Sequence, residues 1–260
     1  MLRYPYFEKK AGVMALSRCS DAARICTTIE VWLLRRVKGA KAAGGIVGLS
    51  GGIDSAVVAV LLKRVFGANM LAVYLPCDSL DSDREDALMV VESFALPFME
   101  VDLSTAFKSL ERDINVPLSQ LARANIKPRL RMTVLYALAQ SNNYLVCGTD
   151  NKAERQIGYF TKYGDGGCDL LPIGDLLKSE VRLLAGYLEI PEPLIKKPPS
   201  AGLWPGQTDE AEIGLAYDQI DAYFSSGIID EEAAERIERL QRASEHKRVP
   251  PPVCIISPEY

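Results

Sequence analysis

The chain has 260 residues, 48% of them hydrophobic and 25% charged, which is enough material for one sizeable α/β core. Its 30 basic and 34 acidic residues leave a net charge of −4, so no global positive field exists to hold a nucleic acid. The longest unbroken apolar run, 56–62, is too short to span a membrane, and we expect a cytoplasmic protein without a membrane partner.

Helix-like and strand-like segments alternate through the first 150 residues. Helical periodicity is found at 20–38, 54–67, 82–94 and 118–140. Further helical material follows the strand 98–103 and runs through residue 112. Short apolar strands are expected at 44–50, 70–76, 98–103 and 143–149. This spacing predicts a parallel twisted sheet with helices on both faces, and ligands of such sheets bind beyond the carboxyl ends of the strands.

We expect a single domain over 1–260 with three parts. Residues 1–40 form a helical lead-in, 44–150 contain the sheet, and 151–260 supply substrate loops and C-terminal helices. In this last part, the Gly- and Pro-rich segments 160–169 and 196–210 predict loops, and helices are expected at 177–188, 209–224 and 230–244.

The stretch 48–55, GLSGGIDS, lies between the first core strand and its helix. Helix N-termini carry free N–H groups and a partial positive charge, and glycine lets the backbone approach a ligand closely. Ser50, Gly51, Gly52 and Ser55 therefore predict a phosphate cradle, although an ordinary capped glycine turn is the alternative. The pattern is neither G-x-x-x-x-G-K-[ST] nor G-x-G-x-x-G, which disfavours kinase-like and dehydrogenase-like functions.

Asp54 is the unexpected member of this loop. A carboxylate beside phosphates repels them unless a divalent cation lies between the two, so Asp54 predicts Mg²⁺ as cofactor. A zinc site is not expected, because the six cysteines show no C-x-x-C spacing and His246 is the only histidine.

The S-G-G-x-D-S pattern resembles the PP-loop of the N-type ATP pyrophosphatases, which split ATP between its α- and β-phosphates. Four further stretches are similar to the ammonia-dependent NAD synthetases of this superfamily: PRLRM (128–132), the segment 148–182 with its FTKYGDGG, TDEAEIGLAYDQID (208–221) and EHKR (245–248). The similarity runs from about residue 44 to residue 248. It implies a Rossmann-like sheet of the adenine nucleotide alpha hydrolase-like kind.

The resemblance also implies a reaction. Members of this family are ligases that form a C–N bond in the final step of NAD biosynthesis. They adenylate the nicotinate carboxylate of deamido-NAD⁺ with ATP, release pyrophosphate, and let ammonia displace AMP. The implied substrates are therefore ATP, deamido-NAD⁺ and free ammonia.

Residue roles follow from the matching motifs. Asp54 and Lys178 match catalytic positions, and Asp54 and Glu154 match Mg²⁺ ligands. The matches to ATP contacts are Gly48, Leu49, Ser50, Gly51, Gly52, Ile53, Asp54, Ser55, Thr149, Lys178 and Ser200. The matches to deamido-NAD⁺ contacts are Arg129, Lys162, Asp169, His246 and Lys247.

Most of these residues also have simpler interpretations. Lys178 and Arg129 fit ordinary helix surfaces, His246 fits an exposed ring in a charged tail, and Asp169 fits a strand or turn cap. The chain departs from many relatives at Tyr74, where an arginine is common, and at two other positions. These are Asn151 in place of a histidine and Ser200 in place of a threonine.

Two other functions remain open from the sequence. A tRNA-thiolating or other PP-loop ligase is disfavoured by the missing C-x-x-C pair and the negative charge, and a non-catalytic nucleotide sensor by the retained Asp54, Glu154 and Lys178. Glutamine-dependent relatives carry an extra amidase domain that this chain has no room for, so we expect direct use of ammonia. A homodimer is implied by resemblance alone.

Overall fold

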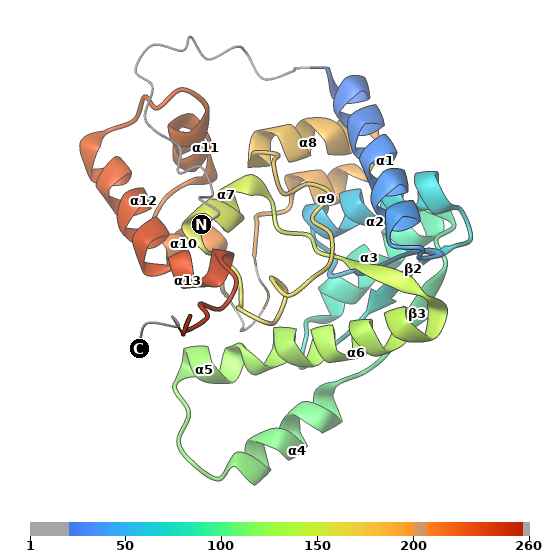
Figure 1. The fold of residues 1–260 in the computed structure, drawn as a ribbon, viewed down its shortest axis with the longest axis horizontal. Coiled ribbons are helices and arrows are strands. Elements are labelled where there is room, and N and C mark those ends of the chain that lie inside the picture. The colour runs from blue at the N-terminus through green and yellow to red at the C-terminus, as the bar shows by residue number, and fades with distance from the viewer. Residues whose placement is uncertain (1–20, 201, 203, 205, 257–260) are drawn as a thin grey trace.

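The structure is a computed structural model that describes residues 21–256 apart from 201, 203 and 205. Residues 1–20 of the expected lead-in lie outside the described residues. Its strands are β1 (Gly44–Gly48), β2 (Met70–Tyr74), β3 (Phe98–Glu100) and β4 (Tyr144–Cys147). Figure 1 shows them packed among helices on one side of the molecule.

The described part of the chain contains thirteen helices. Those of the sheet region are α1 (Ala22–Gly39), α2 (Ile53–Phe66), α3 (Asp81–Phe94), α4 (Ser104–Ile114), α5 (Gln120–Ala124) and α6 (Ile126–Asn142). Those that follow β4 are α7 (Lys152–Ile157), α8 (Lys178–Tyr187), α9 (Glu192–Lys196), α10 (Asp209–Ile213), α11 (Tyr217–Ser225), α12 (Glu231–Ala243) and α13 (Glu245–Arg248). None of them is long and apolar enough to cross a membrane.

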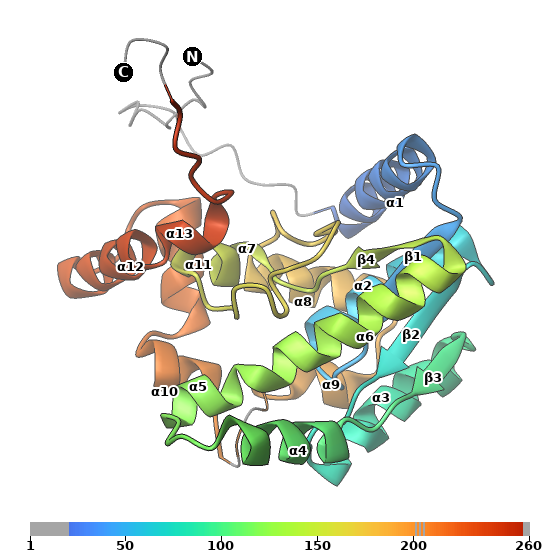
Figure 2. The same cartoon turned by 60° about the horizontal axis from the view of Figure 1, so that its bottom comes forward.

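The sheet confirms the predicted parallel topology. Its strand order is β3-β2-β1-β4, and every pairing between neighbours is parallel. Apolar side chains of α1, α2, α3 and α8 form the core on one face, and those of α4 and α6 pack on the other. Since a parallel sheet buries both faces, its strands read as short continuous apolar runs. Figure 2 shows α6 crossing in front of the strands.

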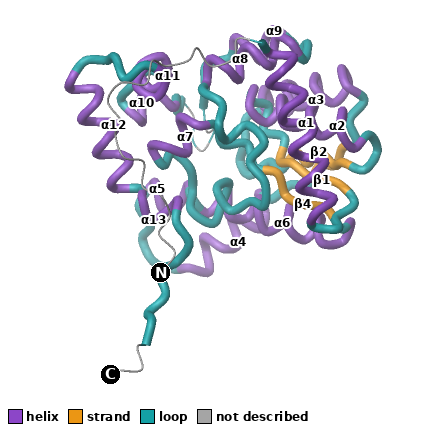
Figure 3. The backbone as a smooth tube through the Cα atoms, turned by 45° about the horizontal axis from the view of Figure 1, so that its top comes forward, coloured by secondary structure: helices purple, strands orange, loops and turns teal. Residues whose placement is uncertain are grey.

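The helices α7, α11 and α12 form a separate apolar cluster around Tyr217, Ile220 and Ile237. Figure 3 places this group beside the sheet rather than on one of its faces. The loops expected at 160–169 and 196–210 are confirmed for the described residues of 160–169 and 197–208, which form no helix or strand. The ends of the second loop belong to α9 and α10 instead.

Each of two predicted helices is split into two shorter helices in the structure. The expected helix 118–140 is interrupted at Asn125, because Pro128 has no N–H to bond the carbonyl of Ala124 four residues earlier. The expected helix 209–224 ends at Gly214, which adopts a left-handed φ of 71°, and α11 starts at Tyr217. The strands predicted at 44–50, 70–76, 98–103 and 143–149 are also shorter than expected.

Candidate active site

A cleft of about 880 Å³ lies at the carboxyl ends of β1, β2 and β4. The glycine loop and residues that follow β2 and β4 form its floor, and segments from 158–165 and 197–212 form its walls. The carboxyl edge of a parallel sheet is where ligands of such folds bind. The topology therefore brings the two loops predicted from sequence, after β1 and after β4, to one site.

The glycine loop is shaped by its own hydrogen bonds. The hydroxyl of Ser55 accepts from the amide of Ser50 at 3.1 Å and donates to the carbonyl of Gly52 at 2.9 Å. Gly51 has φ 81°, and any Cβ there would collide with the backbone carbonyl of Asp83 at the start of α3. The loop therefore needs glycine at this position, and the first residues of α2, Ile53, Asp54 and Ser55, line the cleft.

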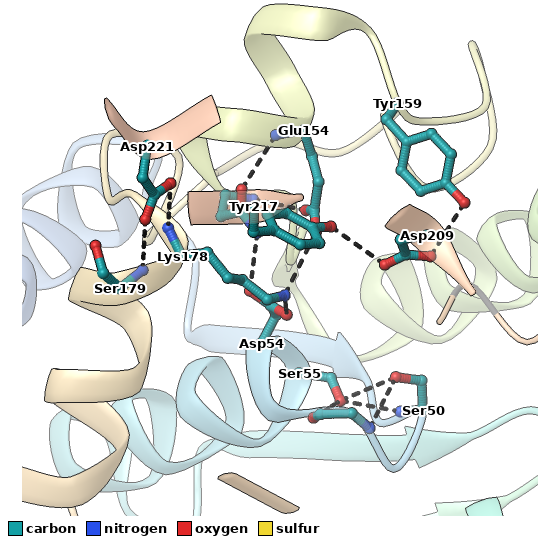
Figure 4. Close-up of polar contacts among 12 residues, drawn as sticks. Ser50, Asp54, Ser55, Glu154, Tyr159, Lys178, Ser179, Asp209, Tyr217 and Asp221 are labelled. Carbon is teal, nitrogen blue, oxygen red and sulfur yellow. Dashed lines mark hydrogen bonds and ion pairs between the residues drawn. The ribbon is translucent and has the colours of Figure 1, made fainter. Parts of the chain in front are cut away.

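Lys178 lies between two carboxylates at the centre of the cleft (Figure 4). Its ammonium forms an ion pair with Asp54 and lies 3.6 Å from Oε1 of Glu154. The Lys178 side chain is only 2% exposed, whereas those of Asp54 and Glu154 are 17% and 13% exposed. A cation held so deeply is costly unless opposite charges compensate it. Lys178, Asp54 and Glu154 therefore form one electrostatic unit, named here the central unit.

The pKa values of this unit follow from burial and charge. Burial alone would lower the pKa of Lys178, but the carboxylates of Asp54 and Glu154 outweigh it and raise that pKa above its ordinary value. Burial raises the pKa of Glu154 to about 7, against the lowering effect of Lys178. Lys178 therefore stays an ammonium at neutral pH, as a group that stabilises phosphate charge requires.

Asn151 connects the segment that carries Asp54 with the segment that carries Glu154. Its side-chain oxygen accepts from the amide of Glu154 at 3.1 Å and caps α7, while its own backbone amide donates to the Glu154 carboxylate at 3.0 Å. Its Nδ2 also donates to Oδ1 of Asp54 at 3.2 Å. The asparagine at this departure from the relatives thus fixes the orientation of both carboxylates.

Three polar residues at this site were not identified from sequence: Tyr217, Asp209 and Asp221. The Tyr217 hydroxyl lies 2.9 Å from Oε1 of Glu154 and 3.2 Å from Oδ2 of Asp209. The Asp221 carboxylate accepts from the amides of Lys178 and Ser179 at the start of α8. All three lie in the stretch 208–221, where Gly214 was the available sign of a helix break.

Four of the five basic and acidic residues matched to the dinucleotide gather at one end of the cleft: Arg129, Lys162, His246 and Lys247 line it. Nζ of Lys162 donates to the carbonyl of His246 at 2.6 Å, and Nε of Arg129 donates to the carbonyl of Lys162 at 3.3 Å. Residues from α6, the 158–165 loop and α13 thus form one basic group, named here the basic end of the cleft.

Asp169 has a different position. It is exposed, and its carboxylate accepts from the amide of Val146 at 2.8 Å and from the hydroxyl of Tyr136 at 3.0 Å. It is not among the described residues that line the cleft. In this structure it ties β4 to α6, which matches the simpler interpretation of Asp169 as a cap.

The other matched positions line the cleft, with the exception of Gly51, which packs against the backbone of Asp83. Thr149 follows β4 and faces the cleft, as does Ser200 in the 197–207 loop. The Ser200 hydroxyl donates to the carbonyl of Gln207 at 2.7 Å and so closes its own loop. Lys197, just before it, pairs with Asp83 and Asp86 of α3 and anchors this loop beside the glycine loop.

A divalent metal fits the central unit by its chemistry. Asp54 and Glu154 converge on one positive charge, the Lys178 ammonium, and both present carboxylate oxygens. Within the described ranges no group of three or more His, Cys, Asp or Glu side chains is placed to hold a metal by itself. Mg²⁺ is commonly held by one or two carboxylates together with substrate phosphates, which is the donor set available here.

Comparisons with known proteins agree with this geometry. The family model of NAD synthase matches residues 25–251. An NH(3)-dependent NAD(+) synthetase of Syntrophomonas wolfei is 47% identical over 234 residues, which cover 88% of this chain and 94% of that protein.

Two solved structures are similar over most of both chains. An NMN synthetase of Francisella tularensis has 37% identity and a TM-score of 0.85, with 92% of this chain and 99% of that chain covered. An NH3-dependent NAD synthetase of Campylobacter jejuni has 29% identity and a TM-score of 0.78, with 90% and 100% covered.

Proposed function

The chain belongs to the NAD synthase family, and we propose that it amidates deamido-NAD⁺ to NAD⁺ with ATP and free ammonia. The nicotinate carboxylate attacks the α-phosphorus of ATP, and pyrophosphate leaves. Ammonia then attacks the carbonyl carbon of the acyl adenylate, gives up a proton, and AMP departs. The product is NAD⁺, the amide of deamido-NAD⁺, and the enzyme is a ligase that forms a C–N bond.

One observation carries this proposal: Lys178 lies between Asp54 and Glu154 beside a glycine loop. Adenylation places growing negative charge on the departing pyrophosphate. We propose that the Lys178 ammonium neutralises this charge, because a preformed cation in a water-poor site stabilises charge that develops during reaction. Ser50, Gly51, Gly52 and Ser55 would bind the same pyrophosphate through backbone and hydroxyl donors.

We propose Asp54 and Glu154 as the Mg²⁺ ligands. Bound Mg²⁺ would supply positive charge that offsets the repulsion between these carboxylates and the phosphates of ATP. The Asn151 amide holds Asp54 from one side, and the capping bonds of α7 hold Glu154. Both carboxylates are thus oriented before any ligand arrives.

The basic end of the cleft is our proposed site for the dinucleotide, which carries two phosphates and a carboxylate. Arg129, Lys162, His246 and Lys247 supply positive charge and hydrogen-bond donors there. Asp169 does not line the cleft, and a role for it in substrate binding stays a prediction that rests on the motif alone.

The test is incubation with ATP, Mg²⁺, deamido-NAD⁺ and ammonium, with NAD⁺ and AMP measured and with glutamine in place of ammonium as control. We expect equal amounts of NAD⁺ and AMP with ammonium. Pyrophosphate release that does not depend on deamido-NAD⁺ would favour another PP-loop ligase. Binding of ATP without any pyrophosphate release would favour a nucleotide sensor.

Nicotinate mononucleotide is a second candidate substrate, because one of the similar structures is named an NMN synthetase. The same assay separates the two. Nicotinate mononucleotide is added in place of the dinucleotide, and the kcat/KM values for the two substrates are compared. A homodimer, a cytoplasmic location and a single domain with the three expected parts also stay predictions.

A further inference from the structure

Tyr217 is one of the largest fully buried side chains of the protein, yet its hydroxyl reaches the active-site cluster. It is the first residue of α11 and packs in the apolar cluster of α7, α11 and α12. A buried aromatic residue in such a cluster is ordinarily a packing residue. The contacts of its ring and hydroxyl point to more than packing.

The ring of Tyr217 lies under the catalytic lysine. Nζ of Lys178 is 4.9 Å from the ring centroid, within the range of a cation–π contact. The hydroxyl meanwhile lies 2.9 Å from Oε1 of Glu154. One side chain thus contacts two of the three members of the central unit, and Figure 4 shows it beside both.

The same helix also holds the backbone of the lysine. Asp221, one turn after Tyr217, accepts from the amide of Lys178 at 3.2 Å and from that of Ser179 at 2.8 Å. These are the first two residues of α8, whose N–H groups have no partner within their own helix. A carboxylate there also has favourable charge for a helix N-terminus.

The break at Gly214 makes these contacts possible. In one continuous helix over 209–224, Asp209 and Tyr217 would lie about 12 Å apart along the axis. With the break, Oδ2 of Asp209 and the Tyr217 hydroxyl are 3.2 Å apart. Asp209 therefore holds the hydroxyl from its other side, and the start of α11 faces α8.

We propose that Tyr217 and Asp221 of α11 are positioning residues for catalysis: Tyr217 orients the Lys178 ammonium and the Glu154 carboxylate, and Asp221 fixes the start of α8. This inference rests on the proposed function, because it assigns Lys178 and Glu154 to the ATP phosphates and their metal. Neither positioning residue is among the described residues that line the cleft.

The sharpest variant is Tyr217→Phe, which keeps the ring under Lys178 and removes only the hydroxyl. We expect kcat to fall about tenfold, with the KM for deamido-NAD⁺ within about twofold of wild type, and the half-saturating Mg²⁺ concentration to rise about tenfold. Tyr217→Leu also loses the cation–π contact and should lower kcat about 100-fold. Asp221→Asn should show a smaller loss in kcat, because one of its two acceptor oxygens remains.

Tyr223→Phe is the matched control. It removes a hydroxyl from the same helix, where Tyr223 lies 3.4 Å from a carboxylate oxygen of Glu238 and does not line the cleft. Its kcat and Mg²⁺ dependence should equal those of wild type. Thermal unfolding of each variant without ligand separates a loss of fold from a loss of positioning.

A second measurement does not depend on turnover. Calorimetry with a non-hydrolysable ATP analogue gives its affinity with and without Mg²⁺. We expect the gain in affinity from Mg²⁺ to be about tenfold smaller in Tyr217→Phe than in wild type, with similar affinities in the absence of Mg²⁺.

If the gain from Mg²⁺ is the same in both proteins, or if Tyr223→Phe loses as much kcat as Tyr217→Phe, the positioning role is wrong. Absence of NAD⁺ formation by wild type would instead refute the proposed function, and calorimetry would still decide the role of Tyr217.

Discussion

Lys178 and Asp54 form a partly buried ion pair although they lie 124 positions apart in the chain. Asp54 lies in the first turn of α2, directly after β1, and Lys178 is the first residue of α8. The two helices pack together on one face of the sheet. Their N-termini therefore meet at its carboxyl edge, where a carboxylate and an ammonium can share one charge centre.

Asp54→Asn should reduce adenylation by at least about 100-fold while the fold is kept, because the neutral amide preserves shape but is a weaker metal ligand and cannot form an ion pair with Lys178. Pyrophosphate release with ATP, Mg²⁺ and deamido-NAD⁺ measures this directly. Asp113→Asn, at an exposed carboxylate of α4, is the control. An active Asp54→Asn enzyme would remove the proposed metal role.

Lys162→Ala should raise the KM for deamido-NAD⁺ about tenfold and leave that for ATP within about twofold. The reason is its place at the basic end of the cleft, where it also orders the backbone of His246. Steady-state kinetics with each substrate varied in turn checks this, with the exposed Lys38→Ala as control. An equal loss for both substrates would contradict the assignment.

Gly51→Ala should weaken both ATP binding and stability. A left-handed φ costs about 1–2 kcal/mol for a residue with a Cβ, and this Cβ would also push Asp83 and the start of α3 away. The control is Gly186→Ala in α8, where an added Cβ meets nothing within 4 Å and should stabilise by about 0.5–1 kcal/mol. Urea unfolding and ATP titration measure the two effects, and equal stability changes at both glycines would refute the backbone argument.

The buried tyrosines predict a loss of stability in alkali. Burial, and next the charge of Asp209, raises the pKa of Tyr159 above its usual 10, and burial with Glu154 does the same for Tyr217. Above about pH 10 the unfolded chain releases these protons and the native state keeps them, so stability falls as pH rises, by up to about 1.4 kcal/mol per pH unit for each tyrosine. The stability that the two protonated tyrosines contribute is fully present below that pH.

Urea unfolding from about pH 9 to 11 measures this slope. Tyr159→Phe should remove the part that Tyr159 contributes to the slope of the free energy of unfolding against pH. A free energy of unfolding that stays constant over this range would show that the two hydroxyls ionise as readily in the native state as in the unfolded chain.

Much of the fold was predictable from local patterns. The alternation of apolar runs with helical periodicity predicts a parallel sheet, because each strand must be buried on both faces and each connection must cross over it. The observed helix ends differ from the predicted ones at two places. Pro128 and Gly214 both end or interrupt helices, but their effect depends on backbone geometry that the apolar periodicity around them conceals.

The order of residues alone determined the glycine loop, its Asp54 and the matching motifs, since a loop that binds phosphate needs these residue types next to one another. Only the tertiary structure decided that Lys178 lies between Asp54 and Glu154, that Asp169 bonds β4 and α6 outside the cleft lining, and that Tyr217 reaches the site. The physical reason is that these relations join segments distant in the chain. Their distances are set by how the helices pack on the sheet, which no local pattern encodes.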